Sequence, residues 1–258
     1  MLRYRLVVEL KKSQELVNWL RYLPSTDSTN LELARMQQIE ALPNFSALVA
    51  GEQTGGQGRL GRSWVSDPEA SISLSLYLDS GAQISQLGFL TLMAAVSLDA
   101  AIKSFDSKIA SGVKWPNDVL VQGKKVSGIL AQIQPDGSLI LGVGINLKKQ
   151  LGAPDTAISL EELGIHANFD EALAAFLIQF RARYAIFTQS PQLAILKTRN
   201  ELSDVCLSLG QKVRAQMPDG TEIIGQAMDI DELGQLVIHS NQGNSVSVSA
   251  ADVWHLRN

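Results

Sequence analysis

The part of the sequence best suited to chemistry is a glycine-rich stretch that runs from Gly51 to Trp64. It holds five of the chain's 20 glycines, together with the guanidinium groups of Arg59 and Arg62. Glycine accepts positive φ angles and lets another molecule approach the backbone closely. Loop N–H groups and arginine side chains together bind carboxylates and phosphates. A mobile surface loop has the same composition, but long loops of this kind are usually functional, so we expect an anion-binding loop.

Two nucleotide-binding motifs can be aligned with this loop, and the surrounding sequence argues against both. Residues 56–61 match the dinucleotide fingerprint GxGxxG, which requires a helix to begin at its end. Here a turn follows, and apolar residues then alternate from Ile72 to Leu78, which is the pattern of a strand. A P-loop needs lysine where Arg62 stands, and a P-loop must also be followed by a helix.

Three lysines on two later segments add to these charges. Lys114 stands before a Trp-Pro bend that keeps it near the backbone, so we favour a functional role over a solvated strand end. Lys124 and Lys125 belong to a Gly-Lys-Lys sequence, which is also ordinary turn composition. Asp118 can coordinate Mg²⁺ or orient a lysine, yet Asn-Asp after proline is equally typical of a turn.

Two glycines and three histidines complete the residues that could carry chemistry. Gly142 and Gly144 lie two residues apart, and therefore on one face of a predicted strand. They mark either a surface on which a ligand lies flat or a bulge, and the sequence leaves both alternatives open. His166, His239 and His255 are scattered without the spacing of zinc ligands or a serine–histidine–aspartate arrangement, so neither chemistry is indicated.

The composition describes a soluble globular protein. With 45% hydrophobic and 19% charged residues, the 258-residue chain can form one large domain and a small one. The net charge of −4 argues against a broadly basic nucleic-acid-binding surface. The single Cys206 excludes an internal disulfide and is expected in the core. We expect no signal peptide, no apolar stretch of membrane-spanning length, no membrane partner and therefore a cytoplasmic location.

Apolar spacing and turn residues predict the order of the elements. The predicted strands are 4–10, 47–50, 71–78, an interrupted strand over 112–121, 126–131 and 139–147. The predicted helices are 29–39 with a Thr29–Glu32 capping box, 86–103, a long helix capped by Asn168 and Glu171, and one from Pro191 to about Ser203. From Leu209 onward, short alternating runs between turns indicate a small β-barrel. We therefore expect one domain over 1–206 and a second over 207–258.

Five segments taken together resemble the biotin protein ligases. They are Ser28-Thr29-Asn30 (the family's STN), the GQGRLGR of residues 56–62 (GRGRRGR), the KWPND of residues 114–118, the KxxGIL of residues 125–130 and the GxGIN of residues 142–146. The tail Asp252–Arg257 also looks like the family's last strand. One such motif is moderate evidence, but these occur in the family's order over nearly the whole chain.

The resemblance implies a fold and a reaction. The expected fold is α+β: a mixed α/β sheet with flanking helices, like that of class II synthetases, followed by a small SH3-like β-barrel. The expected activity is that of a biotin–[acetyl-CoA-carboxylase] ligase, which uses ATP and Mg²⁺ to convert biotin to biotinyl-5′-AMP. The biotinyl group then passes to a lysine of a biotin carboxyl carrier protein. A loop that closes over the labile adenylate and excludes water suits this chemistry.

The resemblance also assigns roles to individual residues. Biotin is expected to contact Ser28, Thr29, Asn30, Gln53, Gln57, Gly58, Arg59, Lys125 and Gly128. ATP is expected to contact Arg62, Trp64, Lys114, Asp118 and Asn146, with Asp118 as the candidate ligand of Mg²⁺. The groups expected to act in catalysis are Lys125, Arg59 and Lys114, because two anions must be brought together when a carboxylate attacks a phosphate.

Several alternatives and departures accompany the resemblance. Gln57 and Leu60 stand where the family's loop carries arginines, which bears on how tightly the loop retains the adenylate. Only 27 residues precede Ser28, fewer than a DNA-binding domain needs, so we expect no binding to operator DNA. A lipoate or octanoate ligase and a non-catalytic biotin or nucleotide sensor are the alternative functions. A homodimer is compatible with the sequence, which leaves the oligomeric state open.

Overall fold

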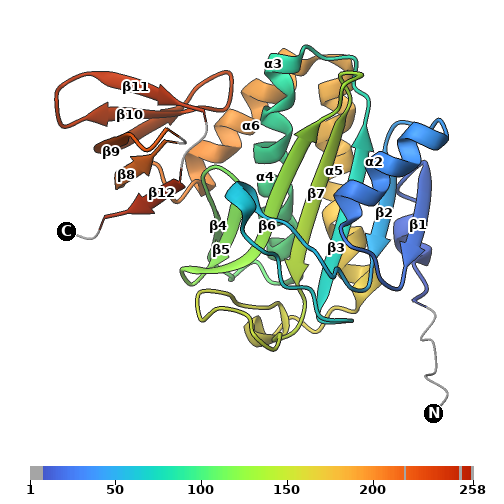
Figure 1. Ribbon diagram of the computed structural model, residues 1–258. Coiled ribbons are helices and arrows are strands. Elements are labelled where there is room, and N and C mark those ends of the chain that lie inside the picture. Colours follow the sequence, from blue (N-terminus) through green and yellow to red (C-terminus); the bar gives the residue numbers. More distant parts are fainter. Residues whose placement is uncertain (1–7, 218, 250–251, 257–258) are drawn as a thin grey trace.

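A seven-stranded sheet organises the larger part of the molecule (Figure 1). The structure, a computed structural model, describes residues 8–217, 219–249 and 252–256. In spatial order the strands are β1 (Trp19–Leu23), β2 (Ser46–Ala50), β3 (Ser71–Leu78), β7 (Leu139–Asn146), β6 (Lys124–Ile133), β5 (Asp118–Val121) and β4 (Ser111–Lys114). Strands β1 and β2 are parallel, and the other neighbouring pairs are antiparallel, so the predicted mixed sheet is confirmed.

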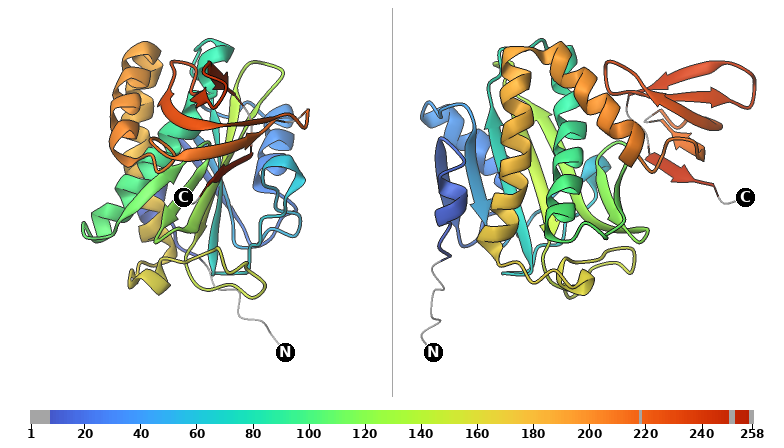
Figure 2. Two further views of the ribbon diagram at one scale, coloured as in Figure 1. Left: turned by 90° about the vertical axis from the view of Figure 1, so that its left-hand side faces the viewer. Right: turned by 180° about the vertical axis from the view of Figure 1, so that it is seen from behind.

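Helices cover both faces of this sheet. Helices α4 (Phe89–Phe105), α5 (Phe169–Gln189) and α6 (Pro191–Val205) lie together on one side, as the rear view in Figure 2 shows. On the other side α2 (Thr29–Ile39) packs against β3 and β7. The short helices are α1 (Lys11–Gln14), α3 (Ile84–Leu87) and the 3₁₀ turns η1 (Arg59–Gly61) and η2 (Glu161–Leu163). Because both faces are covered, every residue of β3 is buried.

The segment Ile84–Phe105, which contains α3 and α4, is long and apolar enough to cross a membrane. By length and apolar composition, the expectation that no stretch is long enough to span a membrane was wrong. However, 67% of its apolar window is buried inside the fold, where Phe89 and Met93 are fully enclosed. Since α4 packs between the sheet and α5, its apolar character is that of a core helix.

The N-terminus of α5 carries the capping box that the sequence predicts. Asn168 Oδ1 accepts a hydrogen bond from Glu171 N at 2.9 Å, and Asn168 N donates to Glu171 Oε2 at 3.2 Å. We expect Asn168→Ala to lower the free energy of unfolding by about 1 kcal/mol, because the end of the helix loses its acceptor. Urea unfolding measures this change, with Asn200→Ala inside α6 as the matched control. An unchanged midpoint for Asn168→Ala would show that the cap contributes nothing.

Two predicted strands differ from the structure. The edge strand is β1, whereas residues 8–10 are irregular and the remainder of the predicted strand 4–10 lies outside the described residues. The interrupted strand predicted over 112–121 is a hairpin, in which β4 and β5 are antiparallel and Lys114 pairs with Asp118. Proline lacks a backbone donor and Asn-Asp favours turns, so the chain reverses direction here instead of bending.

The chain continues into a five-stranded antiparallel sheet beyond the β4–β5 edge of the first sheet (Figure 1). In spatial order its strands are β11 (Ser245–Val248), β10 (Leu236–Ser240), β9 (Glu222–Ile230), β8 (Lys212–Gln216) and β12 (Asp252–His255). Strand β9 pairs with both β8 and β10, and its register with β10 shifts between Val237 and Ile238. The short antiparallel strands fit the predicted SH3-like fold.

The second sheet contacts the first part of the chain at the turn between β4 and β5. Leu207 N donates a hydrogen bond to Val113 O at 2.8 Å, and Trp115 Nε1 donates to Gly234 O at 2.9 Å. The Trp115 side chain is only 1% exposed, so it anchors this junction. Cys206 is buried at the same place, and burial raises the pKa of its thiol, as expected for a core residue and not for a nucleophile.

Candidate active site

A cavity of about 210 Å³ lies on the face of the large sheet that carries α2, beneath the glycine-rich loop. It brings together residues of α2, the loop, five strands of the sheet and the last strand of the second sheet. The predicted site residues that line it are Ser28, Thr29, Asn30, Gln53, Gln57, Gly58, Arg59, Arg62, Trp64, Lys114, Asp118, Lys125 and Gly128. Segments that lie far apart in the sequence therefore meet in one place.

Strand register explains why these segments meet. Ser73 pairs with Gly144, Gly144 with Gly128, Gly128 with Asp118, and Asp118 with Lys114. Residues in register on neighbouring strands point to the same face of a sheet. One row across β3, β7, β6, β5 and β4 therefore has a hydroxyl at one end, glycines in the middle, and an aspartate and a lysine at the other end.

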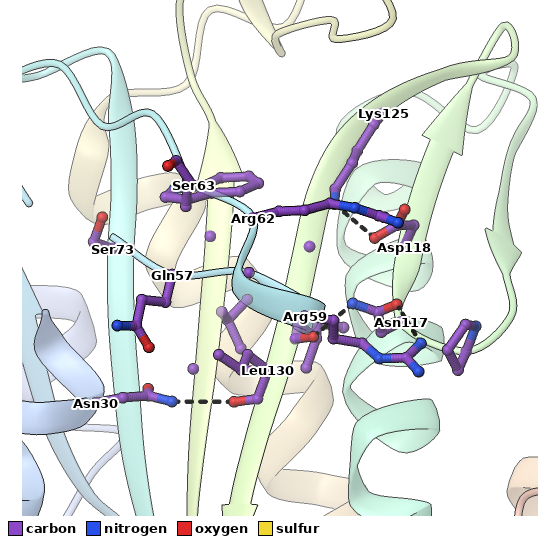
Figure 3. A pocket seen from close by; sticks show the side chains of 18 of the residues that line it. Asn30, Gln57, Arg59, Arg62, Ser63, Ser73, Asn117, Asp118, Lys125 and Leu130 are labelled. Carbon is purple, nitrogen blue, oxygen red and sulfur yellow. Dashed lines mark hydrogen bonds and ion pairs between the residues drawn. The ribbon is translucent and has the colours of Figure 1, made fainter. Parts of the chain in front are cut away.

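The end of the cavity next to α2 is polar and uncharged. Gln53 Oε1 accepts hydrogen bonds from Thr29 N at 2.7 Å and from Thr29 Oγ1 at 3.1 Å. Asn30 Nδ2 lies 3.2 Å from both Leu130 O and Gln132 Oε1, and its contact with Leu130 is drawn in Figure 3. Because Asn30 and Thr29 are almost fully buried, these contacts fix the direction of their side chains.

The start of α2 shows that these residues do not cap the helix. Ser28 is the N-cap residue, and its side chain makes no capping hydrogen bond. Thr29 is the first helical residue, so the predicted Thr29–Glu32 capping box was wrong. Its hydroxyl instead contacts Gln53 and accepts from Ser75 Oγ at 2.8 Å, while Glu32 forms an ion pair with Arg35 at 3.0 Å. The hydroxyl that matches a capping pattern in the sequence therefore belongs to the cavity.

The middle of the cavity has a floor made of glycine backbone. A Cβ atom on Gly144 would lie 2.4 Å from the Trp64 ring, and one on Gly128 would lie 3.3 Å from it. A Cβ atom on Gly142 would lie 2.4 Å from Asn30 Oδ1. The two glycines of β7 thus allow planar side chains to lie close to the strand. The sequence left a bulge open as the alternative, and no bulge is observed in β7.

The other end of the cavity is charged. Lys125 Nζ forms an ion pair with Asp118 Oδ1 at 2.7 Å and lies 5.6 Å from the centre of the Trp64 ring. Figure 3 shows the Arg62 side chain extending over the sheet toward Asp118. Arg59 Nη1 lies 3.4 Å from Asn117 Oδ1, below this cluster. An incoming anion would therefore meet several cations of different segments at once.

The position of Lys125 corrects the predicted turn. The turn residues are Gln122 and Gly123, which both have positive φ angles, at 53° and 75°. Lys124 and Lys125 already belong to β6, where neighbouring side chains point to opposite faces. The pairing of β6 with β5 shifts register between Val119 and Leu120, which interrupts this alternation between Gly128 and Lys125. Lys125 therefore lines the cavity together with Gly128, whereas Lys124 is exposed to solvent.

The glycine-rich loop folds back on itself as a small lid. Gln57 pairs with Ser63 in an antiparallel bridge, and Trp64 N donates a hydrogen bond to Gly56 O at 2.9 Å. The turn η1 at its tip ends at Gly61, whose φ of 73° favours glycine. These contacts hold Gln57 above the sheet, next to the polar end of the cavity, as Figure 3 shows, and Gly58 also lines the cavity.

Asn146 is the predicted ligand contact that does not line the cavity. Its Nδ2 donates to Lys125 O at 3.3 Å and to Ile158 O at 3.2 Å, and its Oδ1 accepts from Gln150 Nε2 at 2.9 Å. The buried amide therefore supports the backbone at Lys125 from behind. Its predicted role toward ATP stays a prediction.

Several cavity residues were missed by the sequence analysis. Gln132 lies four residues after Gly128, so the alternation of a strand could have placed it on the same face. Ser73 could have been found in the same way. Asn117, Val253 and Trp254 also line the cavity. No local signal shows that the last strand of the second sheet reaches it, because that placement depends on how the two sheets pack.

The fold and this site match one class of proteins. Residues 22–149 match the model of the Biotin/lipoate A/B protein ligase family, and residues 208–256 match the Biotin protein ligase C terminal domain. The structure is similar to the biotin protein ligase of Aquifex aeolicus in complex with biotin and ATP. The TM-score is 0.77 at 26% identity, and the match covers 93% of this chain and 100% of that one.

Curated relatives narrow the class. The chain is 36% identical to the biotin–[acetyl-CoA-carboxylase] ligase of Mycobacterium tuberculosis, over 92% of this chain and 89% of that protein. It is 30% identical to the ligase of the same name from Paracoccus denitrificans, over 90% of this chain and 98% of that protein. Its identity to the bifunctional ligase/repressor BirA of Bacillus subtilis is 32%, over 86% of this chain and 68% of BirA. The chain belongs to the biotin protein ligase family.

Proposed function

We propose that this enzyme activates biotin with ATP and transfers the biotinyl group to a lysine of a biotin carboxyl carrier protein. In the first step a carboxylate oxygen of biotin attacks the α-phosphorus of ATP, and pyrophosphate leaves with the electrons of the broken P–O bond. In the second step the lysine amine attacks the acyl carbon, AMP leaves and the amine loses a proton. The observation that carries this proposal is the single row of residues that joins a polar pocket to a cluster of cations.

The polar end of the cavity suits the head group of biotin. A cyclic urea presents one carbonyl acceptor and two N–H donors, and amide and hydroxyl side chains complement both. Thr29 is already hydrogen-bonded to Gln53, and Asn30 to Gln132, so these side chains lose little freedom when a ligand binds. Ser28, Gln57 and Gly58 border the same space.

The charged end suits the reacting carboxylate and the phosphates. Two anions repel each other when the carboxylate approaches the α-phosphorus, and preorganised cations offset that repulsion in the transition state. Lys125 has the central place, between Trp64 and Asp118. Arg59 acts from the loop, while Arg62 and Lys114 act on the phosphates at the far side.

Asp118 is the residue that would hold Mg²⁺. Among residues 8–217, 219–249 and 252–256 there is no cluster of three metal-binding side chains. Mg²⁺ with a nucleotide typically needs only one or two carboxylates, because phosphate oxygens and water supply the remaining ligands. Asp118 fits such a site, since its oxygen already faces the cationic end of the cavity. The ion would supply positive charge to the triphosphate.

The transfer itself tests the proposal. We expect the purified protein to add the mass of one biotinyl group to a biotin carboxyl carrier domain, only when ATP, Mg²⁺ and biotin are all present. A carrier with its target lysine replaced by arginine should stay unmodified. A carrier left unmodified under all these conditions, with an authentic ligase as the positive control, would contradict the proposed acceptor.

The loop residue Gln57 gives a prediction about retention of the adenylate. Gln57 is exposed at the cavity, and arginine there would add a positive charge near the phosphate. We expect Gln57→Arg to slow the release of biotinyl-5′-AMP by about two- to fivefold, the range of an exposed ion pair. A quenched-flow release assay measures this rate, with the distant Gln242→Arg as the control for net charge. Equal rates for the two variants would exclude a contact between residue 57 and the adenylate.

Three further expectations stay predictions. They concern the division of the chain into domains 1–206 and 207–258, the lack of binding to operator DNA and membranes, and the homodimer. A cytoplasmic location is in keeping with the buried position of α4, and it too awaits a direct measurement.

A further inference from the structure

The last strand of the second sheet reaches the charged end of the cavity. Strand β12 lies at the edge of that sheet, paired with β8, and Val253 and Trp254 line the cavity. The end-on view in Figure 2 shows this sheet facing the same end of the large sheet that carries β4 and β5. The next residue, His255, is about half-buried and makes a contact that none of the steps above uses.

His255 is connected to the β4–β5 turn through one serine. Trp115 N donates a hydrogen bond to Ser208 Oγ at 3.2 Å, and Ser208 Oγ lies 3.0 Å from His255 Nε2. Ser208 is fully buried, so its hydroxyl must find its hydrogen-bond partners within the protein and not in the solvent. A backbone N–H can only donate, so the hydroxyl accepts from Trp115 and directs its own proton to an acceptor. The imidazole nitrogen is that acceptor when His255 is neutral with its proton on Nδ1.

The charge state of His255 agrees with this direction. Burial, and then the positive charge of Lys114, lower the pKa of His255 below its ordinary value. The neutral imidazole is therefore favoured near neutral pH. The same observation places Lys114 close enough to His255 for their charges to interact, although the two residues come from different sheets.

Lys114 is the residue whose direction this chain of hydrogen bonds controls. It precedes Trp115, whose backbone N–H is tied to Ser208 and whose ring is tied to Gly234. Lys114 also ends the row of residues that crosses the cavity, where it pairs with Asp118. A substitution of Ser208 would thus displace Lys114 at the nucleotide end of the cavity and leave the polar end near α2 unchanged.

We propose that His255 is a positioning residue for ATP: through Ser208 it holds the backbone at Trp115 and thereby fixes Lys114 against the triphosphate. The inference rests on the proposed adenylation reaction. The second sheet would thereby take part in adenylation, because His255 at its end helps to hold Lys114 of the large sheet in position. Biotin binding is independent of this support.

Steady-state and binding measurements on variants of His255 test the inference. We expect His255→Leu to raise the KM for ATP about tenfold in adenylate formation, because the buried hydroxyl of Ser208 loses its acceptor. The value of kcat should change less than threefold, because the substitution weakens the binding of ATP equally in the ground state and in the transition state. The dissociation constant of biotin should stay the same. His255→Gln, whose side-chain oxygen reaches about where Nε2 lies, should restore most of the affinity for ATP.

Controls separate positioning from a general loss of structure. His239→Leu, an exposed residue of the same sheet, should leave the KM for ATP unchanged. Ser208→Ala should raise the KM for ATP, and adding His255→Leu to it should cause little further change, because both remove the same connection. If His255→Leu fails to fold by circular dichroism, the comparison of wild type, His255→Gln and Ser208→Ala still decides the question.

Two outcomes would overturn the inference. One is an unchanged KM for ATP in folded His255→Leu or Ser208→Ala, and the other is an equal rise in KM for ATP and in the dissociation constant of biotin. Failure of the proposed function gives a different result, because the wild-type enzyme would then form no biotinyl-5′-AMP at all.

Discussion

Replacing Lys125 by alanine is expected to slow the formation of biotinyl-5′-AMP by a factor of about 10² to 10³, which is typical for loss of one preorganised charge from a transition state. Its ammonium group lies 2.7 Å from Asp118 and beside the face of Trp64, at the point where the polar and charged ends of the cavity meet. The carboxylate of a biotin whose head group is bound at the polar end would reach this group first. Single-turnover formation of the adenylate, followed by rapid quench, measures the rate.

The neighbouring lysine provides a matched control. Lys124 differs from Lys125 by one position, but it is exposed and does not line the cavity. We expect Lys124→Ala to retain the wild-type rate within about twofold, as for most surface substitutions. If Lys125→Ala and Lys124→Ala had the same rate, or if Lys125→Ala were fully active at saturating biotin and ATP, the role given to Lys125 would be wrong.

Gly142→Ala is expected to weaken biotin binding by about tenfold to a hundredfold. The new methyl group would lie 2.4 Å from Asn30 Oδ1, a distance that forces the amide to move. That amide is buried and contacts Leu130 O, Gln132 and Ser75, so moving it disrupts several hydrogen bonds at once. Each buried partner left unsatisfied costs about 1–3 kcal/mol, and about 1.4 kcal/mol corresponds to tenfold in affinity. Isothermal titration with biotin measures the change.

Gly88→Ala serves as the control for this substitution. Gly88 is the N-cap residue of α4 and has a φ of −57°, and a Cβ atom there would have no heavy atom within 4 Å. Its affinity for biotin should equal that of the wild type. Wild-type affinity in a folded Gly142→Ala protein would mean that the polar end of the cavity does not hold biotin.

The sequence predicts local structure well where one physical signal acts alone. Strict alternation fixes β3 at residues 71–78, and the reciprocal pair Asn168 and Glu171 fixes the start of α5. At Thr29 two signals coincide, because a hydroxyl three residues before a glutamate suits a capping box as well as a binding site. The structure decides between them, since the Thr29 hydroxyl contacts Gln53 and Ser75.

Contacts that depend on a chain reversal or on packing between sheets could not be predicted in the same way. The pairing of Lys114 with Asp118 depends on a sharp turn at Trp115, and a gentle bend would have placed the two residues apart. The position of Trp254 in the cavity depends on how two sheets pack, which no local pattern encodes. The motifs identified the segments that form the site, while strand register and packing determine which side chains meet.

Formation of the acyl-adenylate is the most direct test of the claim that one cavity binds biotin at its polar end and activates it at its charged end. The protein is incubated with ATP, Mg²⁺ and either biotin or octanoate, and the products are identified by mass spectrometry. We predict biotinyl-5′-AMP with biotin and no acyl-adenylate with octanoate. Octanoyl-adenylate alone would assign the cavity to a lipoate-type substrate. If neither forms while biotin still binds, the protein is a biotin sensor and the account given for Lys125, Arg59 and Lys114 is contradicted.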